Sequence, residues 1–265
     1  AARATLQRAL AIDEAAYGPD HPQVAITLTN LGIVQRELGE LAGARATLQR
    51  ALAIDEAAYG PDHPQVAMTL TNLGNVQREL GELAGARATL QRALAAFQAA
   101  YGPDHPQVAV TLTNLGSVQQ ELGELAAARA TFQRALAIKE AAYGPDHPQV
   151  AVTLTNLGIV QRELGDLPDA RATLQRALAI FEAAYGPDHP QVAMALGNLG
   201  NVQQELGDLA GARATQQRAL AIEEAAYGPD HPQVATARRR LRNVQRPGRP
   251  WDVLRRRNSR QDQSR

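Results

Sequence analysis

The chain contains no cysteine, few aromatic residues and no long apolar run. Without cysteine it has no disulfide framework, no thiolate nucleophile and no cysteine-based zinc site, which is compatible with the cytoplasmic setting that we predict. No apolar stretch approaches the length that spans a bilayer, and the first residues are not a signal sequence. Aromatic residues make up only 4% of the chain, so we expect thin contacts between its packed elements.

What the sequence has instead is a repeat of 42 residues. The string YGPDHPQVA occurs six times, and the tyrosine that opens each copy lies at Tyr17, Tyr59, Tyr101, Tyr143, Tyr185 and Tyr227. A fixed period of this size indicates one supersecondary unit repeated along an axis. Such an array offers a long surface rather than one obvious pocket, so we predict a binding protein that is not an enzyme.

The first part of each period predicts a helix. In the first full copy, apolar residues between Pro22 and Leu38 recur every three or four positions, which places them on one helical face. Gly39 follows directly and predicts the end of that helix. The helix starts at Asp20 or His21, either of which would cap the first turn that Pro22 favours.

The second part of each period predicts another helix. Residues 41–58 are rich in alanine, which favours helix and lets neighbouring helices pack closely. Two helices with short connections, repeated, predict an all-α solenoid of antiparallel helix pairs. Because the chain starts within a repeat, we also expect an upstream region. We divide the chain into a partial repeat with the second helix only (1–16), five full 42-residue helix pairs (20–226), a terminal capping helix (227–246) and an arginine- and proline-rich tail that we expect to be disordered (247–265).

The repeat resembles a known family, the tetratricopeptide repeat. The resemblance rests on small and apolar residues that recur in each period, which in the first full copy are Leu28, Leu31, Gly32, Gly39, Ala44, Leu48 and Ala51. The long period and the Gly-Pro-Asp-His-Pro connector are similar to those of the kinesin light chains and of many bacterial tetratricopeptide proteins. The resemblance implies a right-handed α-α superhelix whose concave groove binds a peptide segment of a partner protein. One departure is a glutamine where the family has an aromatic residue near the end of the first helix: Gln35, Gln77, Gln119, Gln161 and Gln203.

Differences between the copies indicate which positions face that groove. The most variable first-helix positions are those of Ile26, Ile33 and Arg36, whose offsets of seven and three residues put them on one helical stripe. A threonine position and an unbroken row of asparagines accompany the stripe. Beside the variable Ile26, Met68, Val110, Val152 and Met194, the predicted groove residues are Asn30, Asn72, Asn114, Asn156, Asn198, Thr29, Thr71, Thr113, Thr155, Ile33, Asn75, Ser117, Ile159, Asn201, Arg36, Arg78 and Arg162.

An asparagine side chain offers two donors and an acceptor, so a row of asparagines suits the backbone of an extended peptide without demanding a particular sequence. The alternative is that each asparagine bonds to the neighbouring repeat. Arg36, Arg78 and Arg162 could pair with acidic side chains of a ligand, although adjacent residues such as Glu37 would partly neutralise them. A solvated charged face is the alternative for these pairs.

Two further sets of residues give no prediction of chemistry. One position late in the second helix holds Asp13, Asp55, Phe97, Lys139, Phe181 and Glu223 in turn, and this mixture predicts an exposed site that has drifted. The six histidines all follow an aspartate in the connector, too far apart to share one metal ion, so we predict that they cap helices or pack in the loop. No phosphate-binding loop or serine nucleophile motif occurs. We therefore predict no catalytic residue, no metal and no cofactor.

The end of the chain differs from the array in charge. Residues 236–265 contain eleven arginines and two aspartates, a net charge of about +9, whereas the rest of the chain is acidic. The arginines of the last helix predict a polar face that ends the array. The tail could bind nucleic acid or an acidic surface, although a solvated tail is the simpler interpretation. Our leading hypothesis is a peptide-binding scaffold, and the alternatives are a structural spacer or array that self-associates through its exposed helix ends, and nucleic-acid binding through the tail.

Overall fold

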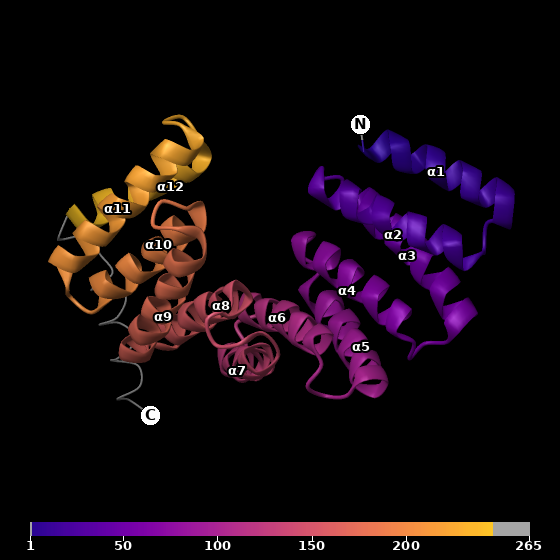
Figure 1. Cartoon of the computed structure of the whole chain (residues 1–265), viewed down its shortest axis with the longest axis horizontal. Coiled ribbons are helices and arrows are strands. Elements are labelled where there is room, and N and C mark those ends of the chain that lie inside the picture. Colours follow the sequence, from indigo (N-terminus) through magenta and orange to yellow (C-terminus); the bar gives the residue numbers. More distant parts are fainter. Residues whose placement is uncertain (1, 246–265) are drawn as a thin grey trace, which may run out of the picture. The chain divides into compact units, whose positions relative to one another are not determined.

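The computed structural model describes residues 2–245, which form helices joined by short connections (Figure 1). They divide into two compact units, one ending at Leu164 and the other beginning at Gly165. The helices of the first unit are α1 (Ala2–Tyr17), α2 (Pro22–Glu37), α3 (Leu41–Tyr59), α4 (Pro64–Glu79), α5 (Leu83–Tyr101), α6 (Pro106–Glu121), α7 (Leu125–Tyr143) and α8 (Pro148–Leu164). Those of the second unit are α9 (Leu167–Tyr185), α10 (Pro190–Glu205), α11 (Leu209–Tyr227) and α12 (Pro232–Gln245). The predicted all-α array of helix pairs is confirmed, whereas the predicted tail at 247–265 lies outside the described residues.

Each first-type helix, with an even number, begins at a proline that follows a histidine cap. Before α4, His63 has an extended backbone (φ −74°, ψ 143°), and its Nδ1 accepts a hydrogen bond from the backbone N–H of Gln65 at 3.1 Å. The same bond occurs at all six histidines, with lengths from 3.1 to 3.3 Å. Each imidazole also packs on the tyrosine four residues earlier, with ring centroids 4.5 to 4.9 Å apart. The prediction that the histidines cap helices is therefore confirmed.

Glycines end both types of helix. Gly81 follows α4 with φ +78°, and Gly102 follows α5 with φ +86°, a left-handed conformation that is accessible to glycine without steric cost. Within each unit, connections of only three or four residues then reverse the chain. Consecutive helices within each unit consequently pack antiparallel.

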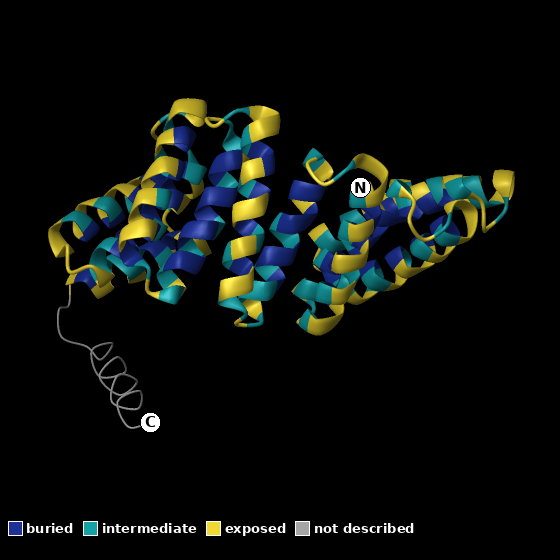
Figure 2. Cartoon of the chain, turned by 90° about the horizontal axis from the view of Figure 1, so that it is seen from below, coloured by how far each residue is buried: buried dark blue, intermediate teal, exposed yellow. Residues whose placement is uncertain are grey.

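The core of each unit lies between its helices, where the inward faces are buried (Figure 2). Close packing depends on glycine at one position of the first-type helix. A Cβ on Gly74 of α4 would lie 2.7 Å from Cγ of Leu90 on α5, which is too close for any side chain. Buried residues of α4, α5, α6 and α7 form a cluster in the first unit, which includes Val66, Leu70, Ala93, Phe97, Val108 and Leu112. A cluster of the second unit comprises Leu167, Ala170, Leu174, Leu199 and Val202.

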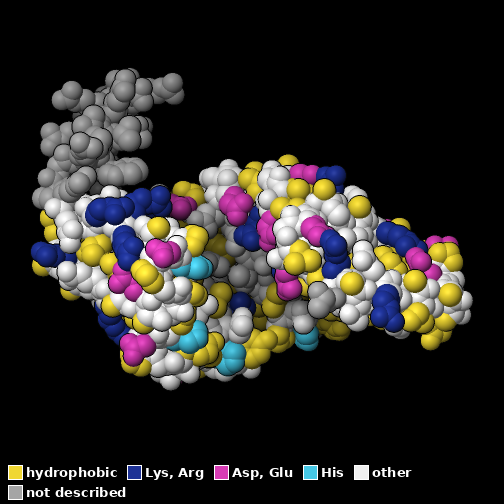
Figure 3. All heavy atoms as spheres, turned by 90° about the horizontal axis from the view of Figure 1, so that it is seen from above, with side chains coloured by type: hydrophobic (Ala, Val, Ile, Leu, Met, Phe, Trp, Pro, Cys, Tyr) yellow, Lys and Arg dark blue, Asp and Glu magenta, His cyan; other side chains and the backbone are white. Residues whose placement is uncertain are grey.

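Ion pairs connect successive second-type helices of the first unit. Arg92 Nη2 on α5 lies 2.6 Å from Glu56 Oε1 on α3, and Arg45 on α3 pairs with Glu82 at the start of α5. On this unit, basic and acidic side chains accordingly lie next to one another in Figure 3. Exposed pairs of this kind contribute at most about 1 kcal/mol each, so burial between the helices dominates the stability.

Candidate functional site

The solvent-exposed sides of α2, α4, α6 and α8 form one surface of the first unit, which we call the first-helix surface. These helices contact one another directly. The hydroxyls of Thr29 on α2 and Thr69 on α4 lie 3.4 Å apart, and the amide of Gln120 on α6 donates to Glu163 on α8 at 3.0 Å. Each helix presents an apolar side chain at the same place, and these side chains are the exposed Ile26, Met68 and Val110 and the half-buried Val152.

The predicted asparagine row lies beside this apolar row, four residues further along each helix. Asn30 is exposed, whereas Asn72, Asn114 and Asn156 are half-buried. The amide of Asn72 donates to the carbonyl of Met68 in its own helix at 3.2 Å. The other three side chains make no hydrogen bond within residues 2–245. None of the four amides bonds to the neighbouring repeat, so they remain available to a ligand.

The second unit has one asparagine at the position of this row, on α10, and a different residue on α12. Asn198 on α10 is half-buried, and α12 carries Arg240 at the next equivalent position. The predicted groove residue Asn201 is engaged internally, because its Oδ1 accepts a hydrogen bond from the amide of Gln216 at 3.2 Å. The second unit therefore presents a different polar surface from that of the first.

The threonine and serine hydroxyls at the predicted groove positions of the first unit bond mostly within their own helices. The hydroxyls of Thr71, Thr113 and Thr155 donate to backbone carbonyls one turn back at 2.7 to 2.9 Å, and Ser117 does the same at 3.1 Å. Thr29 and Thr155 are buried. Ile33, Asn75 and Ile159 are half-buried. Because the hydroxyls of Thr71, Thr113 and Thr155 already donate to carbonyls of their own helices, they have little freedom to bind a ligand.

Arg36 and Arg78, two of the predicted arginines, are paired with acidic residues of the next repeat. Arg36 Nε lies 3.7 Å from Glu79 Oε1, and Arg78 Nη1 lies 3.3 Å from Glu121 Oε1. Arg162 also has an interaction partner. The partner stands 43 residues further along the chain, one position beyond the repeat period, so comparison of adjacent residues missed it. These pairs leave no cationic row along the surface.

The prediction that the late second-helix position is exposed is wrong. Asp13 is half-buried, and the other five side chains are between 0 and 7% exposed: Asp55, Phe97, Lys139, Phe181 and Glu223. The position faces the following first-type helix, and threonines there provide polar partners. Thr69 donates to Asp55 at 2.8 Å, and Lys139 Nζ donates to Thr153 at 2.9 Å. Hydroxyls in the next helix therefore allow charged residues inside the array.

Burial shifts the pKa of three of these groups. It lowers the pKa of Lys139 from 10.5 to about 8. It raises the pKa of Asp55, with the hydrogen bond from Thr69 and the charge of His63 acting in the opposite direction. It also raises the pKa of Glu223, against the opposing charges of Arg240 and His231.

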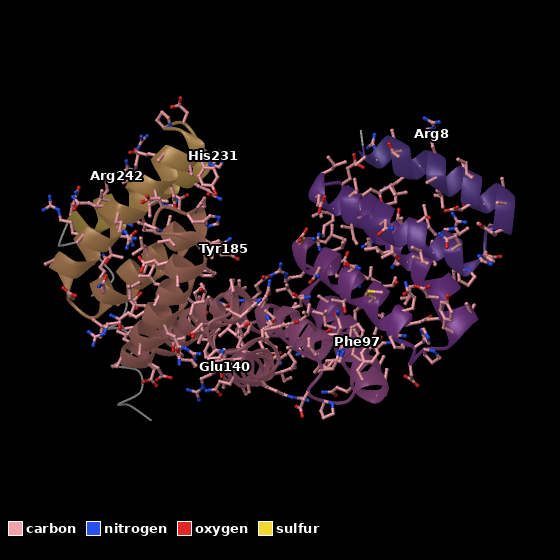
Figure 4. The ribbon with its side chains drawn as sticks, viewed as in Figure 1. Arg8, Phe97, Glu140, Tyr185, His231 and Arg242 are labelled. Atoms are coloured by element: carbon pink, nitrogen blue, oxygen red, sulfur yellow. The ribbon has the colours of Figure 1, made fainter. Side chains whose placement is uncertain are left out.

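The same buried position lines a cavity in each unit. In the first unit a cavity of about 250 Å³ lies between α4, α5 and α6, lined by Met68, Phe97 and Tyr101 among others (Phe97 is labelled in Figure 4). In the second unit a cavity of about 340 Å³ lies between α10, α11 and α12, lined by residues that include Met194 and Glu223. Each opens at the end of a second-type helix, next to the stacked tyrosine and histidine.

Other chemistry is limited in the described part of the chain. Within residues 2–245, no three histidine, aspartate or glutamate side chains converge so that they could hold a metal ion. Among the same residues, no helix is long and apolar enough to cross a bilayer. On the first-helix surface, the available groups are amides and apolar side chains next to the ion-paired Arg36 and Arg78.

Comparison with known proteins agrees with this geometry. Tetratricopeptide repeat matches occur at residues 1–57, 36–99, 78–141, 120–183, 162–222 and 193–252, and no curated protein matches the chain. The crystal structure of BtubC (BKLC) from P. vanneervenii is similar, with a TM-score of 0.74 and 21% identity over 87% of this chain and 92% of that one. A Podosopora anserina structure described as kinesin light chain nearly identical TPR-like repeats has a TM-score of 0.68 and 19% identity over 78% of this chain and 98% of its own. YrrB, described as a TPR protein with an unusual peptide-binding site, has a TM-score of 0.52 and 21% identity over 87% and 98%.

Proposed function

We propose that this chain, which belongs to the tetratricopeptide repeat family, holds an extended peptide segment of a partner protein on the first-helix surface. The family is in general a scaffold for interactions between proteins. The observation that carries the proposal is the row of asparagine amides at Asn30, Asn72, Asn114 and Asn156, none of which bonds to a neighbouring repeat. An amide can donate to a peptide carbonyl and accept from a peptide N–H at once.

The spacing of the row suits an extended chain. Helices that pack against each other lie about 8–10 Å apart, and an extended peptide advances about 3.3 Å per residue. One asparagine is thus available about every third peptide residue. The apolar row beside it, represented by Met68 and Val110, would contact side chains of the same peptide. Because the nearby arginines are paired, the surface favours an uncharged segment.

A peptide array tests this proposal. Short peptides immobilised on the array are probed with the whole chain, and the bound sequences are remeasured with a variant that carries Asn72→Ala, Asn114→Ala and Asn156→Ala. Each lost hydrogen bond costs about 1 kcal/mol, so we expect the dissociation constant to rise roughly 100-fold.

The control changes three amides that point away from this surface. Gln49, Gln91 and Gln133 lie at equivalent exposed positions of α3, α5 and α7. Their replacement by alanine should leave peptide binding unchanged. Equal affinities of the asparagine variant and the original chain would refute the proposal.

Self-association is a second candidate, and one observation favours it. Ile12 on α1 is 65% exposed, whereas the equivalent Ile54 and Ile138 are only 5% and 4% exposed. A second copy that covers this face would bury the exposed isoleucine. Sedimentation across a range of concentrations tests this, and replacement of Ile12 by glutamine should then shift the equilibrium to monomer.

We also propose a non-catalytic role, because the family is in general a scaffold and residues 2–245 offer no arrangement of nucleophile, base and oxyanion donors. The lack of cysteine is compatible with the cytoplasmic location that we propose. Nucleic-acid binding by the tail at 247–265 concerns residues that the structure does not describe. Deletion of those residues, followed by a salt titration of DNA binding, distinguishes this alternative from peptide capture.

A further inference from the structure

The cavities of the two units differ in the residue at the base, and Arg240 lines the cavity of the second unit in addition. Phe97 lines the cavity between α4 and α6, whereas Glu223 stands at the equivalent position between α10 and α12. The walls are otherwise similar, since Met194 and Tyr227 occupy the places of Met68 and Tyr101. A largely apolar cavity thus contains a carboxyl group that is only 7% exposed.

One oxygen of this carboxyl group lacks a hydrogen-bond partner among residues 2–245. Oε2 of Glu223 makes no hydrogen bond within the described residues. The reason is visible by comparison with Lys139, which donates to Thr113 and Thr153 at 3.2 and 2.9 Å. The residues equivalent to these two threonines around Glu223 are Gly197 and Ala237. Loss of both hydroxyls leaves a buried carboxyl group without a donor, which is costly unless a ligand supplies one.

Arg240 lines the same cavity without closing a salt bridge to Glu223 within residues 2–245. Its guanidinium lies against Gly197, where a Cβ would be 2.5 Å from Nη1. Burial raises the pKa of Glu223, and the positive charge of Arg240, with that of His231, acts in the opposite direction. Arg240 also takes the place of the asparagine row, where it can donate to a peptide carbonyl at the rim.

We infer that the cavity between α10, α11 and α12 binds the protonated amino or guanidinium group of a lysine or arginine side chain, with Glu223 as its counter-ion. The aliphatic part of that side chain would pack against Met194 and Tyr227. This step rests on the proposed function, because it adds a side-chain preference to a bound peptide. The two units would then favour different side chains of a bound peptide, because Phe97 takes the place of Glu223 in the cavity of the first unit.

The two methionines of the chain allow a direct test. Met194 lines the cavity with Glu223, and Met68 lines the cavity with Phe97. In the whole chain labelled with ¹³C at the methionine methyl groups, each cavity has its own NMR signal. Titration with n-butylammonium, and separately with n-butylguanidinium, should shift the Met194 signal to saturation and leave the Met68 signal in place. The uncharged 1-butanol should bind the Met194 cavity at least about tenfold more weakly.

Variants assign the effect to the carboxylate. Glu223→Gln keeps the shape and removes the charge, so the dissociation constant of n-butylammonium should rise at least about tenfold. Arg240→Gln removes a positive charge that repels a bound cation, so it should lower that constant several-fold when measured at a pH where Glu223 of the variant is ionised. Glu223→Phe reproduces the residue found at Phe97 and Phe181, so the fold should be preserved, and it should abolish the response to the cation.

Several results would overturn the inference. These are the absence of a saturable Met194 shift in the original chain, an equal response to 1-butanol, or an unchanged affinity in Glu223→Gln. Because the probes are small and need no peptide, such a result leaves peptide capture by the asparagine row intact. Conversely, loss of the asparagine-dependent peptide binding with cation binding preserved would refute only the proposed function.

Discussion

Replacement of Lys139 measures how much free energy the array loses by burying a charged side chain. Its side chain is 3% exposed, and its ammonium group contacts only hydroxyl oxygens, those of Thr113 and Thr153. Burial lowers its pKa from 10.5 to about 8, which corresponds to about 3 kcal/mol of unfavourable free energy while the folded state carries the charge. Replacement of Lys139 by methionine should therefore stabilise the protein at neutral pH by up to about 3 kcal/mol.

The pH dependence follows from the lowered pKa. Below pH 8 the amine is protonated in both the folded and the unfolded chain, so the penalty is fully present. Between pH 8 and 10.5 the unfolded chain binds more protons, and the stability of the original chain rises. The advantage of Lys139→Met should thus be largest at pH 7 and mostly lost near pH 10.5. The substitution leaves no orphan donor, since Thr113 and Thr153 still donate to carbonyls of their own helices.

Urea unfolding followed by circular dichroism at pH 7 and pH 10.5 measures this difference. Other titrating groups are the same in both proteins and cancel when the two are compared. Gln133→Met, at an exposed position of α7, controls for the added methionine. If Lys139→Met were no more stable than this control at pH 7, or if its advantage were the same at both pH values, the ammonium group would not be the source of the penalty.

Three further substitutions test the packing of the repeat. Gly74→Ala should destabilise the protein by about 1–3 kcal/mol in urea unfolding because its Cβ would meet Leu90, whereas Gly85→Ala, at a more open position, should be neutral or stabilising. His105→Ala should cost about 1 kcal/mol through loss of the helix cap, and His105→Asn, which keeps an acceptor, should recover most of it. Gln77→Leu should raise the stability by about 1 kcal/mol, since its buried Oε1 has no hydrogen-bond partner within residues 2–245.

The positions of the helices could be predicted because their signals are local. Proline, glycine and the apolar spacing within 22–38 predict the ends of a helix that the structure places at Pro22–Glu37. The confirmed pairing of helices follows from the short connections. The glutamine row had a visible consequence as well, because an amide in place of an aromatic ring brings a buried oxygen, as at Gln35 and Gln77.

The interior polar residues could not be predicted because their partners come from another repeat. A position that alternates between charged and aromatic residues is usually exposed, yet Asp55 and Lys139 are buried against hydroxyls 14 residues further along the chain. The threonine 14 residues further along the chain is the sequence feature that could have indicated this burial. It does not distinguish a charged from an apolar residue, since Thr111 stands 14 residues after Phe97 as well. The pairs of Arg36 and Arg78 with glutamates 43 residues away were missed for the same reason.

In α12, the last helix among the described residues, one side chain prevents a further second-type helix from packing as in the earlier copies. In the earlier copies a glycine lets the second-type helix approach, as Gly116 does beneath Phe132, where a Cβ would lie 2.8 Å from the ring. In α12 the equivalent residue is Arg242, which is exposed (labelled in Figure 4). A further second-type helix could not pack there in the same geometry, because the arginine side chain would occupy its place. Head-to-tail pairing of α12 with the exposed face of α1 in another copy is disfavoured for the same reason, so any self-association should use α1 alone.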